Sequence, residues 1–225
     1  MATVRVLRRA GCEVVWDGRQ VCCGQPGYNA GYRHEAAQVA RTLLDAFEEA
    51  DVVVAPSGSC VAMVRNHLPD LLPHLPDALW PRAERLRGRT FELTELLADH
   101  LGIVDLGASL PVKATWHPPC HLLRELNVEA APRRLLRAVE GLDLVPLGEA
   151  ERCCGFGGAF AVKLPELSVA MGEEKARRVL ETGASVVVTA DPGCMLQLRG
   201  LLQRLGSPVR VAHIAEVLAA RGALA

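Results

Sequence analysis

Residues 186–194 read VVVTADPGC, and residues 52–60 read VVVAPSGSC, at an offset of 134 positions. Each stretch joins a continuous β-branched run to a short turn and a cysteine. An apolar run without alternation predicts a strand that is buried on both faces of a parallel sheet. Asp191 and Pro192 predict the N-cap and first turn of a helix that begins beside Cys194. This order of strand, turn and helix favours an α/β fold.

Other parts of the chain are related at similar offsets. The tripeptide CCG occurs at residues 22–24 and again at 153–155, which is an offset of 131. The sequence ELLA at 95–98 matches EVLA at 216–219, an offset of 121. Self-similarity over this distance predicts two related structural units.

We expect two repeated, doubly wound α/β halves with mostly parallel sheets, comprising residues 1–105 and 106–225 and joined near 102–111. Strands are predicted at residues 13–16, 52–55, 112–116, 142–145 and 185–189, and long helices at 33–50 and 165–181. The second half contains every expected element. The counterpart of its opening strand, 112–116, would fall before Met1, so we expect the first half to be truncated at its amino end.

The composition excludes several classes of protein. The 225 residues carry 25 basic and 26 acidic side chains, a formal net charge of −1, so no electrostatic attraction to nucleic acid is predicted. No uninterrupted apolar run approaches ~18 residues, which excludes a membrane span. The amino end reaches Arg8 and Arg9 without an apolar signal core, so a cytoplasmic protein is expected.

Eight cysteines stand out in a chain that is expected to remain in a reducing compartment. There, clustered cysteines favour metal ligands or reactive thiols over disulfides. Seven of them follow predicted strands: Cys22, Cys23, Cys60, Cys120, Cys153, Cys154 and Cys194. The eighth, Cys12, lies beside an expected strand and is interpreted as an ordinary buried apolar side chain.

The second half holds a full set of four thiols, Cys120, Cys153, Cys154 and Cys194. Because ligands of open parallel sheets gather outside the carboxyl ends of the strands, these thiols are predicted to converge. Four thiolates suit an iron–sulfur cluster or zinc. Adjacent cysteines tend to diverge and can reach different irons, which favours a cluster and leaves zinc as the alternative. Gly155, Gly157 and Gly158 would let the backbone come close to a cluster, where their N–H groups would donate to sulfur.

Four short motifs together resemble the cysteine-rich CCG domain family. They are CCGQP at 22–26, APSGSC at 55–60, PCHLLR at 119–124 and CCGFGG at 153–158. This family includes subunits of heterodisulfide reductase, glycolate oxidase and lactate-utilisation systems, and the motifs look most similar to the last of these. The resemblance covers essentially the whole chain.

The resemblance implies an iron–sulfur electron-transfer subunit of an L-lactate (2-hydroxy acid) oxidising complex. It implies a cluster of [4Fe–4S] type on Cys120, Cys153, Cys154 and Cys194, and a second metal set on Cys22, Cys23 and Cys60. The second set lacks its amino-terminal member, so this site is either lost, completed by another ligand, or complete only in a longer chain. The implied partners are a ferredoxin-type iron–sulfur subunit and a third subunit.

Two other functions fit the same cysteines. One is a heterodisulfide or thiol–disulfide reductase that acts at its own cluster, and the other is a zinc-binding scaffold subunit. An oxidoreductase subunit is favoured over a self-sufficient enzyme, and no catalytic residue is assigned. His117 and His121 flank Cys120 and offer further ligands or proton carriers, although an orienting role through hydrogen bonds is favoured. Trp16, Trp80 and Trp116 are interpreted as residues of the core or of the interface between subdomains.

Overall fold

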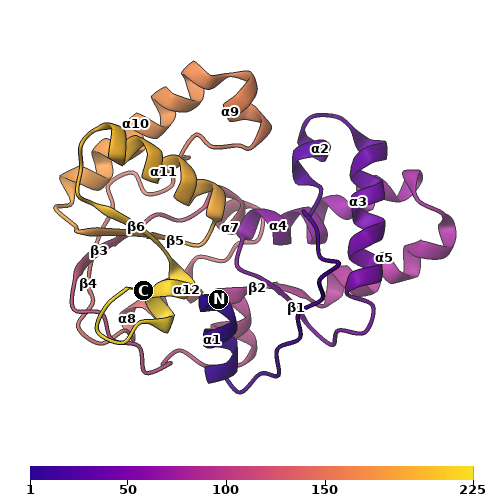
Figure 1. Ribbon diagram of the computed structural model, residues 1–225, viewed down its shortest axis with the longest axis horizontal. Coiled ribbons are helices and arrows are strands. Elements are labelled where there is room, and N and C mark those ends of the chain that lie inside the picture. Colours follow the sequence, from indigo (N-terminus) through magenta and orange to yellow (C-terminus); the bar gives the residue numbers. More distant parts are fainter. Residues whose placement is uncertain (225) are drawn as a thin grey trace.

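The computed structural model describes residues 1–224 and contains two parallel sheets (Figure 1). The second half forms a four-stranded sheet in the order β4-β3-β5-β6. Its strands are β3 (Lys113–Trp116), β4 (Asp143–Val145), β5 (Val186–Thr189) and β6 (Arg210–His213). All pairings in this sheet are parallel, with Trp116 opposite Val188 and Thr189 opposite His213. Parallel neighbours require crossover connections, which helices provide here.

Helices cover both faces of this sheet. The connections contain α7 (Cys120–Arg124), α8 (Ala130–Arg137), α9 (Ala159–Lys163), α10 (Pro165–Glu181) and α11 (Pro192–Arg204), and α12 (Ile214–Ala219) follows β6. On β5, Val186 and Val188 share an apolar core with α8 and α12, whereas Val187 shares another with α10 and α11. All residues of β5 are therefore buried, which explains an apolar run without alternation. The predicted doubly wound α/β fold is confirmed.

The first half holds a two-stranded parallel sheet of β1 (Val53–Ala55) and β2 (Thr90–Glu92). Its helical segments are α1 (Ala2–Arg9), α2 (Gln25–Asn29), α3 (Arg33–Ala46), α4 (Gly58–Ala62), η1 (Met63–His67), η2 (Leu68–His74), η3 (Asp77–Leu79), α5 (Trp80–Gly88), α6 (Leu93–Glu95) and η4 (Leu96–His100). α3 packs on η2 and α5 around a separate core that includes Leu43, Leu71 and Leu86. Across residues 1–224, no helix combines the length and apolar character that crossing a bilayer requires.

Matching helix caps show that the sequence repeat is also a structural one. Glu92 ends β2 and caps α6 in a capping box with Glu95. His213 ends β6 and caps α12 in a capping box with Glu216. A capping box satisfies backbone N–H groups that a helix start leaves unpaired. β1 and β2 are thus the counterparts of β5 and β6.

The strand predicted at residues 13–16 is wrong, because these residues form no regular structure. The corresponding strand of the second half, β4, pairs only with β3, and no strand within residues 1–224 occupies the place of β3 beside β1. Segment 13–16 therefore has no neighbour with which to complete a ladder of hydrogen bonds. Val15 and Trp16 are 81% and 75% exposed, so the core or interface position predicted for Trp16 is also wrong.

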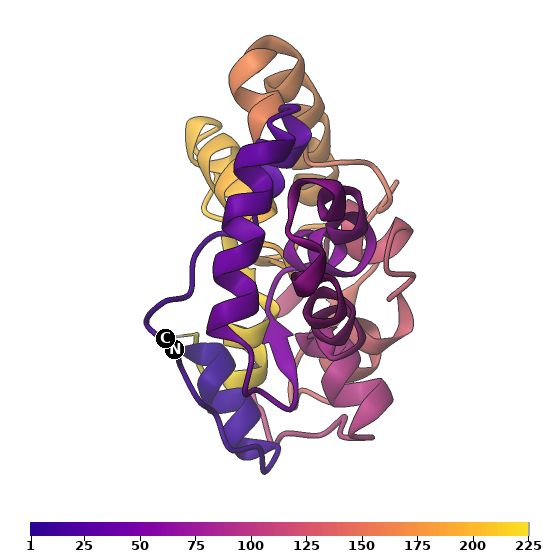
Figure 2. The ribbon, with the colours of Figure 1, turned by 90° about the vertical axis from the view of Figure 1, so that its right-hand side faces the viewer.

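The larger apolar core contains residues from both halves of the sequence. Helices α1 and α12 lie side by side (Figures 1 and 2), and Val6 and Leu7 of α1 are buried in the core that also includes β3 and β5. Arg9 donates a hydrogen bond from Nη1 to the Leu218 carbonyl at 3.2 Å. Cys12 packs at the edge of this core and is partly exposed. The boundary between residues 105 and 106 stays a prediction, and this core crosses it.

The carboxyl group of Glu92 should make stability depend on pH. Glu92 is fully buried, and burial raises its pKa to about 7 from an ordinary value of 4.5. The folded state therefore holds a proton that the unfolded state loses, and this stabilisation is present below pH 4.5 and lost as pH rises to 7. Relative to Glu92→Gln, the free energy of unfolding of the wild type should fall by about 3 kcal/mol across this window.

Chemical denaturation at several pH values measures this difference. Glu129→Gln is the matched control, because Glu129 is exposed and its side chain makes no hydrogen bond within the described residues. Parallel pH profiles for the wild type and Glu92→Gln would contradict the prediction.

Candidate metal centre

The four cysteines of the second half lie beyond the carboxyl ends of three neighbouring strands. Cys120 is the first residue of α7, which follows β3. Cys153 and Cys154 lie in the loop after β4, and Cys194 lies in the first turn of α11, after β5. Parallel strands end at the same edge of the sheet, so the fold directs these residues to one place. The convergence predicted from sequence depends on this arrangement.

The four sulfur atoms form a continuous contact chain. The Cys154 thiol donates to the Cys194 sulfur at 3.2 Å. Cys120 and Cys154 also lie close enough to Cys153 to lower its pKa, so these sulfur atoms are neighbours as well. Cys154 and Cys194 are buried, whereas Cys120 and Cys153 are partly exposed. Cys154 and Cys194 are thus in direct contact, and the role of the four thiols as ligands belongs to the proposal below.

The glycine-rich loop that carries Cys153 is pressed against neighbouring helices. The Gly155 N–H donates to the Cys153 sulfur at 3.3 Å, as the sequence predicted. Gly155 has a positive φ of 84°, and a Cβ there would lie 2.4 Å from the Ser168 carbonyl oxygen of α10. A side chain at this position is therefore excluded both by conformation and by space.

The pKa of the Cys153 thiol is lowered, whereas the pKa values of its neighbours Cys120 and Cys154 are raised. Close contact with the Cys120 and Cys154 thiols, together with a hydrogen bond from the Gly155 N–H, lowers the pKa of Cys153 to about 2. The same contact with Cys153 and burial raise the pKa values of Cys120 and Cys154. Cys153 is therefore the first thiol of the set to ionise, and the thiolate is the form that binds metal.

A buried lysine stands beside these thiols. Lys175 of α10 donates from Nζ to the Glu149 carbonyl at 2.8 Å and to the Ala150 carbonyl at 3.1 Å. Burial lowers its pKa, and negative charge on Cys120, Cys154 and Cys153 opposes that shift. An ammonium in this position offsets the charge of nearby thiolates. Sequence reasoning missed Lys175, although its spacing places it on the buried face of α10 with Gly172 and Val179.

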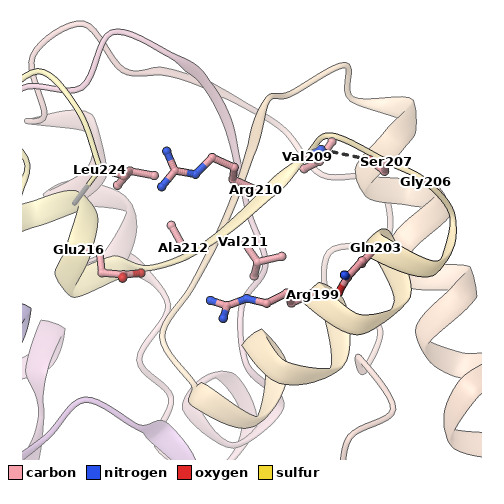
Figure 3. A pocket seen from close by; sticks show the side chains of 10 residues that line it. All are labelled: Arg199, Gln203, Gly206, Ser207, Val209, Arg210, Val211, Ala212, Glu216 and Leu224. Carbon is pink, nitrogen blue, oxygen red and sulfur yellow. Dashed lines mark hydrogen bonds between the residues drawn. The ribbon is translucent and has the colours of Figure 1, made fainter.

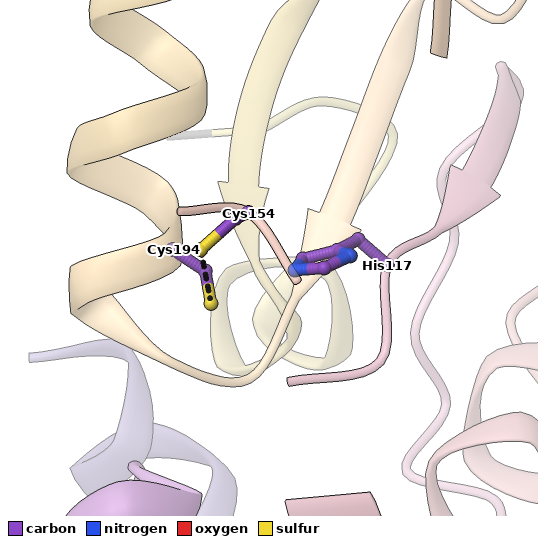
Figure 4. Close-up of side chains that lie close together, drawn as sticks. All are labelled: His117, Cys154 and Cys194. Atoms are coloured by element: carbon purple, nitrogen blue, oxygen red, sulfur yellow. Dashed lines mark hydrogen bonds between the residues drawn. The ribbon is translucent and has the colours of Figure 1, made fainter. Parts of the chain in front are cut away.

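Within residues 1–224, His117 is the one histidine grouped with these cysteines. It follows β3 directly, and Figure 4 shows its ring turned toward Cys154 and Cys194. One ligand atom of each of these three residues lies within 4.8 Å of the others. His117 is 0% exposed, neither ring nitrogen has a hydrogen-bond partner, and burial and the Lys175 charge lower its pKa to about 3. The orienting role through hydrogen bonds that the sequence favoured is therefore wrong for His117.

His121 points elsewhere, although it also flanks Cys120 in sequence. Its Nε2 lies 3.4 Å from Gln25 Nε2 and 3.4 Å from a Glu125 carboxylate oxygen. The contact with Gln25 connects α7 to α2, which follows Cys23 in the first half. The hydrogen-bonding role that the sequence favoured is thus met by His121.

The cysteines of the first half come together only in part. Cys23 hydrogen-bonds to Cys60, which lowers the pKa of Cys60 to about 7 and raises that of Cys23. The Ser57 hydroxyl, which caps α4, accepts a hydrogen bond from the Cys60 N–H. Cys22 is exposed and makes no hydrogen bond to either thiol within the described residues. Of the three first-half cysteines, only Cys23 and Cys60 therefore form a close pair within the described residues.

A buried carboxylate connects the two cysteine sites. Asp191 caps α11 by accepting the Gly193 N–H at 2.9 Å. Its other oxygen accepts from the Ser57 hydroxyl at 3.0 Å, the Ser59 hydroxyl at 2.7 Å and the Ser59 N–H at 3.2 Å. Ser57 and Asp191 occupy matching positions of the repeat, so the two loops meet through equivalent residues. The sequence indicated the cap on α11 but not this contact.

Close helix packing supports the same junction. Cys60 lies on α4 and Cys120 begins α7, and these two helices are in contact. A Cβ at Gly58 would lie 2.7 Å from Leu122 Cβ, so only glycine permits this approach. The two cysteine sites consequently face each other across a tightly packed boundary.

A separate pocket lies away from the cysteines (Figure 3). It is formed around β6 and α11, and its polar lining includes Arg199, Gln203, Arg210 and Glu216. No cysteine or histidine lines it, and residues of the turn before β6 form its other side. This pocket therefore contains none of the candidate metal ligands.

A repeated parallel α/β fold with clustered thiols at one sheet edge defines a class of cysteine-rich proteins. The model of the cysteine-rich domain family CCG matches residues 1–65 and 114–199. The chain therefore belongs to the CCG cysteine-rich domain family.

Similar proteins carry a common name. The chain is 48% identical over 222 residues to the Lactate utilization protein A of Exiguobacterium sp. (strain AT1b), an alignment that covers 96% of this chain and 89% of that protein. It is also 48% identical to the proteins of that name from Geobacillus kaustophilus, with 98% and 91% covered, and Bacillus pumilus, with 98% and 92% covered.

Removal of the Asp191 carboxylate should destabilise the junction between the halves. Asp191→Ala deletes a helix cap and leaves the buried Ser57 hydroxyl without its acceptor, so we expect a loss of about 2–4 kcal/mol in unfolding free energy. Urea denaturation measures this loss. Asp143→Ala, at an exposed position whose side chain makes no hydrogen bond within residues 1–224, should change stability by less than about 0.5 kcal/mol. Equal stabilities of the two variants would refute the assignment.

Proposed function

We propose that the chain acts in lactate utilisation, as an iron–sulfur electron-transfer subunit of an L-lactate (2-hydroxy acid) oxidising complex. The observation that carries this proposal is the convergence of Cys120, Cys153, Cys154 and Cys194 at one sheet edge. The 48% identity to proteins named Lactate utilization protein A supports the metabolic role. A cytoplasmic location is part of the same proposal.

The four thiols would hold the cluster. A bound [4Fe–4S]-type centre would supply one-electron redox chemistry at this edge of the sheet. The chain provides thiolates, since hydrogen bonds favour ionisation of Cys153 and the buried Lys175 offsets negative charge. Burial of Cys154 and Cys194 excludes water from one side of the site. These properties fit a group of several metal atoms with a net negative ligand set.

The exposed side of the site is where electrons would enter or leave. Cys120 and Cys153 are partly exposed, in contrast to the other two thiols. A ferredoxin-type iron–sulfur subunit that binds over these residues would come near the centre without entering the core. A third subunit would complete the complex, so this chain would work as an oxidoreductase subunit.

The first-half cysteines form a second, incomplete metal set in this proposal. Cys23 and Cys60 are in contact, and the pKa of Cys60, about 7, makes a thiolate accessible near neutral pH. Cys22 is exposed and free to turn toward an incoming ion. Binding at this set would require at least one more ligand than the three cysteines.

Loss of a central thiol should abolish cluster binding. We expect Cys154→Ser and Cys194→Ser, purified without oxygen, to lose most of the iron, acid-labile sulfide and visible absorbance of the wild type, because serine replaces a buried sulfur ligand. Elemental analysis and absorption spectra measure this. Cys12→Ser is the matched control, since Cys12 packs at the edge of the apolar core and should retain full iron. Unchanged iron in the first two variants would rule out the ligand assignment, and stoichiometric zinc without iron would favour the zinc scaffold.

The iron-loaded chain should depend on partners for its redox reaction. Alone, it should neither be reduced by L-lactate nor reduce a disulfide with electrons from an artificial donor, because no group that converts a substrate is assigned to it. When the other subunits of the complex are added, L-lactate should reduce the cluster of this chain. Bleaching of the visible absorbance of the cluster measures this reduction. Disulfide reduction by the isolated chain with an artificial electron donor would instead support the reductase alternative.

A further inference from the structure

An unpartnered imidazole faces the cysteine site. The side chain of His117 is 0% exposed, and neither Nδ1 nor Nε2 has a hydrogen-bond partner. Buried polar groups in folded proteins almost always have partners, so an orphaned one needs an explanation. Both ring nitrogens of His117 lack a hydrogen-bond partner, whereas a buried histidine with a purely structural role forms a hydrogen bond through at least one of them.

The backbone holds His117 in this position. Its N–H donates to the Val188 carbonyl at 2.9 Å, which continues the pairing of β3 with β5 beyond the strand end. Two prolines follow at 118 and 119, and α7 begins at Cys120. The ring is therefore placed by the sheet itself and not by a mobile loop.

Within residues 1–224, no protein group hydrogen-bonds to either ring nitrogen of His117. The Cys154 thiol donates to Cys194, and the Lys175 ammonium donates to the carbonyls of Glu149 and Ala150. The ligand atoms of His117, Cys154 and Cys194 nevertheless lie within 4.8 Å of one another (Figure 4). A metal ion between them is the partner that would satisfy all three.

We propose that His117 supplies a nitrogen ligand to the metal centre held by the second-half cysteines, which makes this a mixed cysteine–histidine site. This inference rests on the proposed iron–sulfur function. His117 would be a fifth donor beside the four thiols, and a neutral imidazole adds no negative charge. Where histidine takes the place of a thiolate ligand, it raises the reduction potential of an iron–sulfur cluster. His121 has no such role, because its ring contacts Gln25 and Glu125 instead.

Pulsed electron paramagnetic resonance on anaerobically reconstituted protein tests the proposal. The full chain is labelled with ¹⁵N-histidine, loaded with iron and sulfide, and measured in whichever redox state has an odd electron count. We expect a strongly coupled histidine nitrogen in the wild type. The signal should remain in His121→Gln, the matched control, and disappear in His117→Gln. In His117→Cys, a thiolate should replace the nitrogen and lower the midpoint potential.

The outcomes separate the two proposals. Iron and sulfide without a strongly coupled histidine nitrogen in the wild type would overturn His117 ligation and leave the iron–sulfur function intact. The same signal in folded His117→Gln would also overturn it. A wild type that takes up neither iron nor sulfide would overturn the proposed function, and His117 ligation of a cluster with it. The wild-type spectrum decides the question even if a variant fails to fold.

Discussion

The parallel pairing of β3 with β5 is the interaction on which the site depends. With Trp116 opposite Val188, the two strands end at the same edge, and the chain leaves each one toward the same side. His117 and Cys120 follow one strand, and Cys194 follows the other. β4 joins β3 on its far side and delivers Cys153 and Cys154 in the loop beyond. Residues more than seventy positions apart, such as Cys120 and Cys194, meet for this reason alone.

Charge balance is the second constraint on this edge of the sheet. Several thiols in close contact cannot all ionise unless something offsets their mutual repulsion. Lys175 provides a cation from α10, and the Gly155 N–H provides a dipole directed at Cys153. Both groups lie on the side of the sheet covered by α10 and α11. The same burial that keeps water away from Cys154 also keeps the His117 ring neutral.

The repeat explains how the two halves are joined. Ser57 and Asp191 cap matching helices, and the Ser57 hydroxyl donates to the Asp191 carboxylate across the boundary. Gly58 allows α4 to approach Leu122 of α7, which brings the helix that carries Cys60 against the helix that begins at Cys120. Each cysteine site is therefore supported by a loop of the other half.

Periodicity, turn residues and the internal repeat determined the α/β class, the central strand β5, the cap at Asp191 and the set of cysteines, because these depend on local chemistry. The segment at 13–16 shows the limit of such reasoning. It has the apolar character of a strand, yet a strand requires a neighbour, and none is present beside it in residues 1–224. Lys175 and the two orphaned nitrogens of His117 were likewise decided by tertiary structure. Segments far away in the sequence determine whether a polar side chain is buried and which groups then surround it. A local sequence pattern contains no information about those segments.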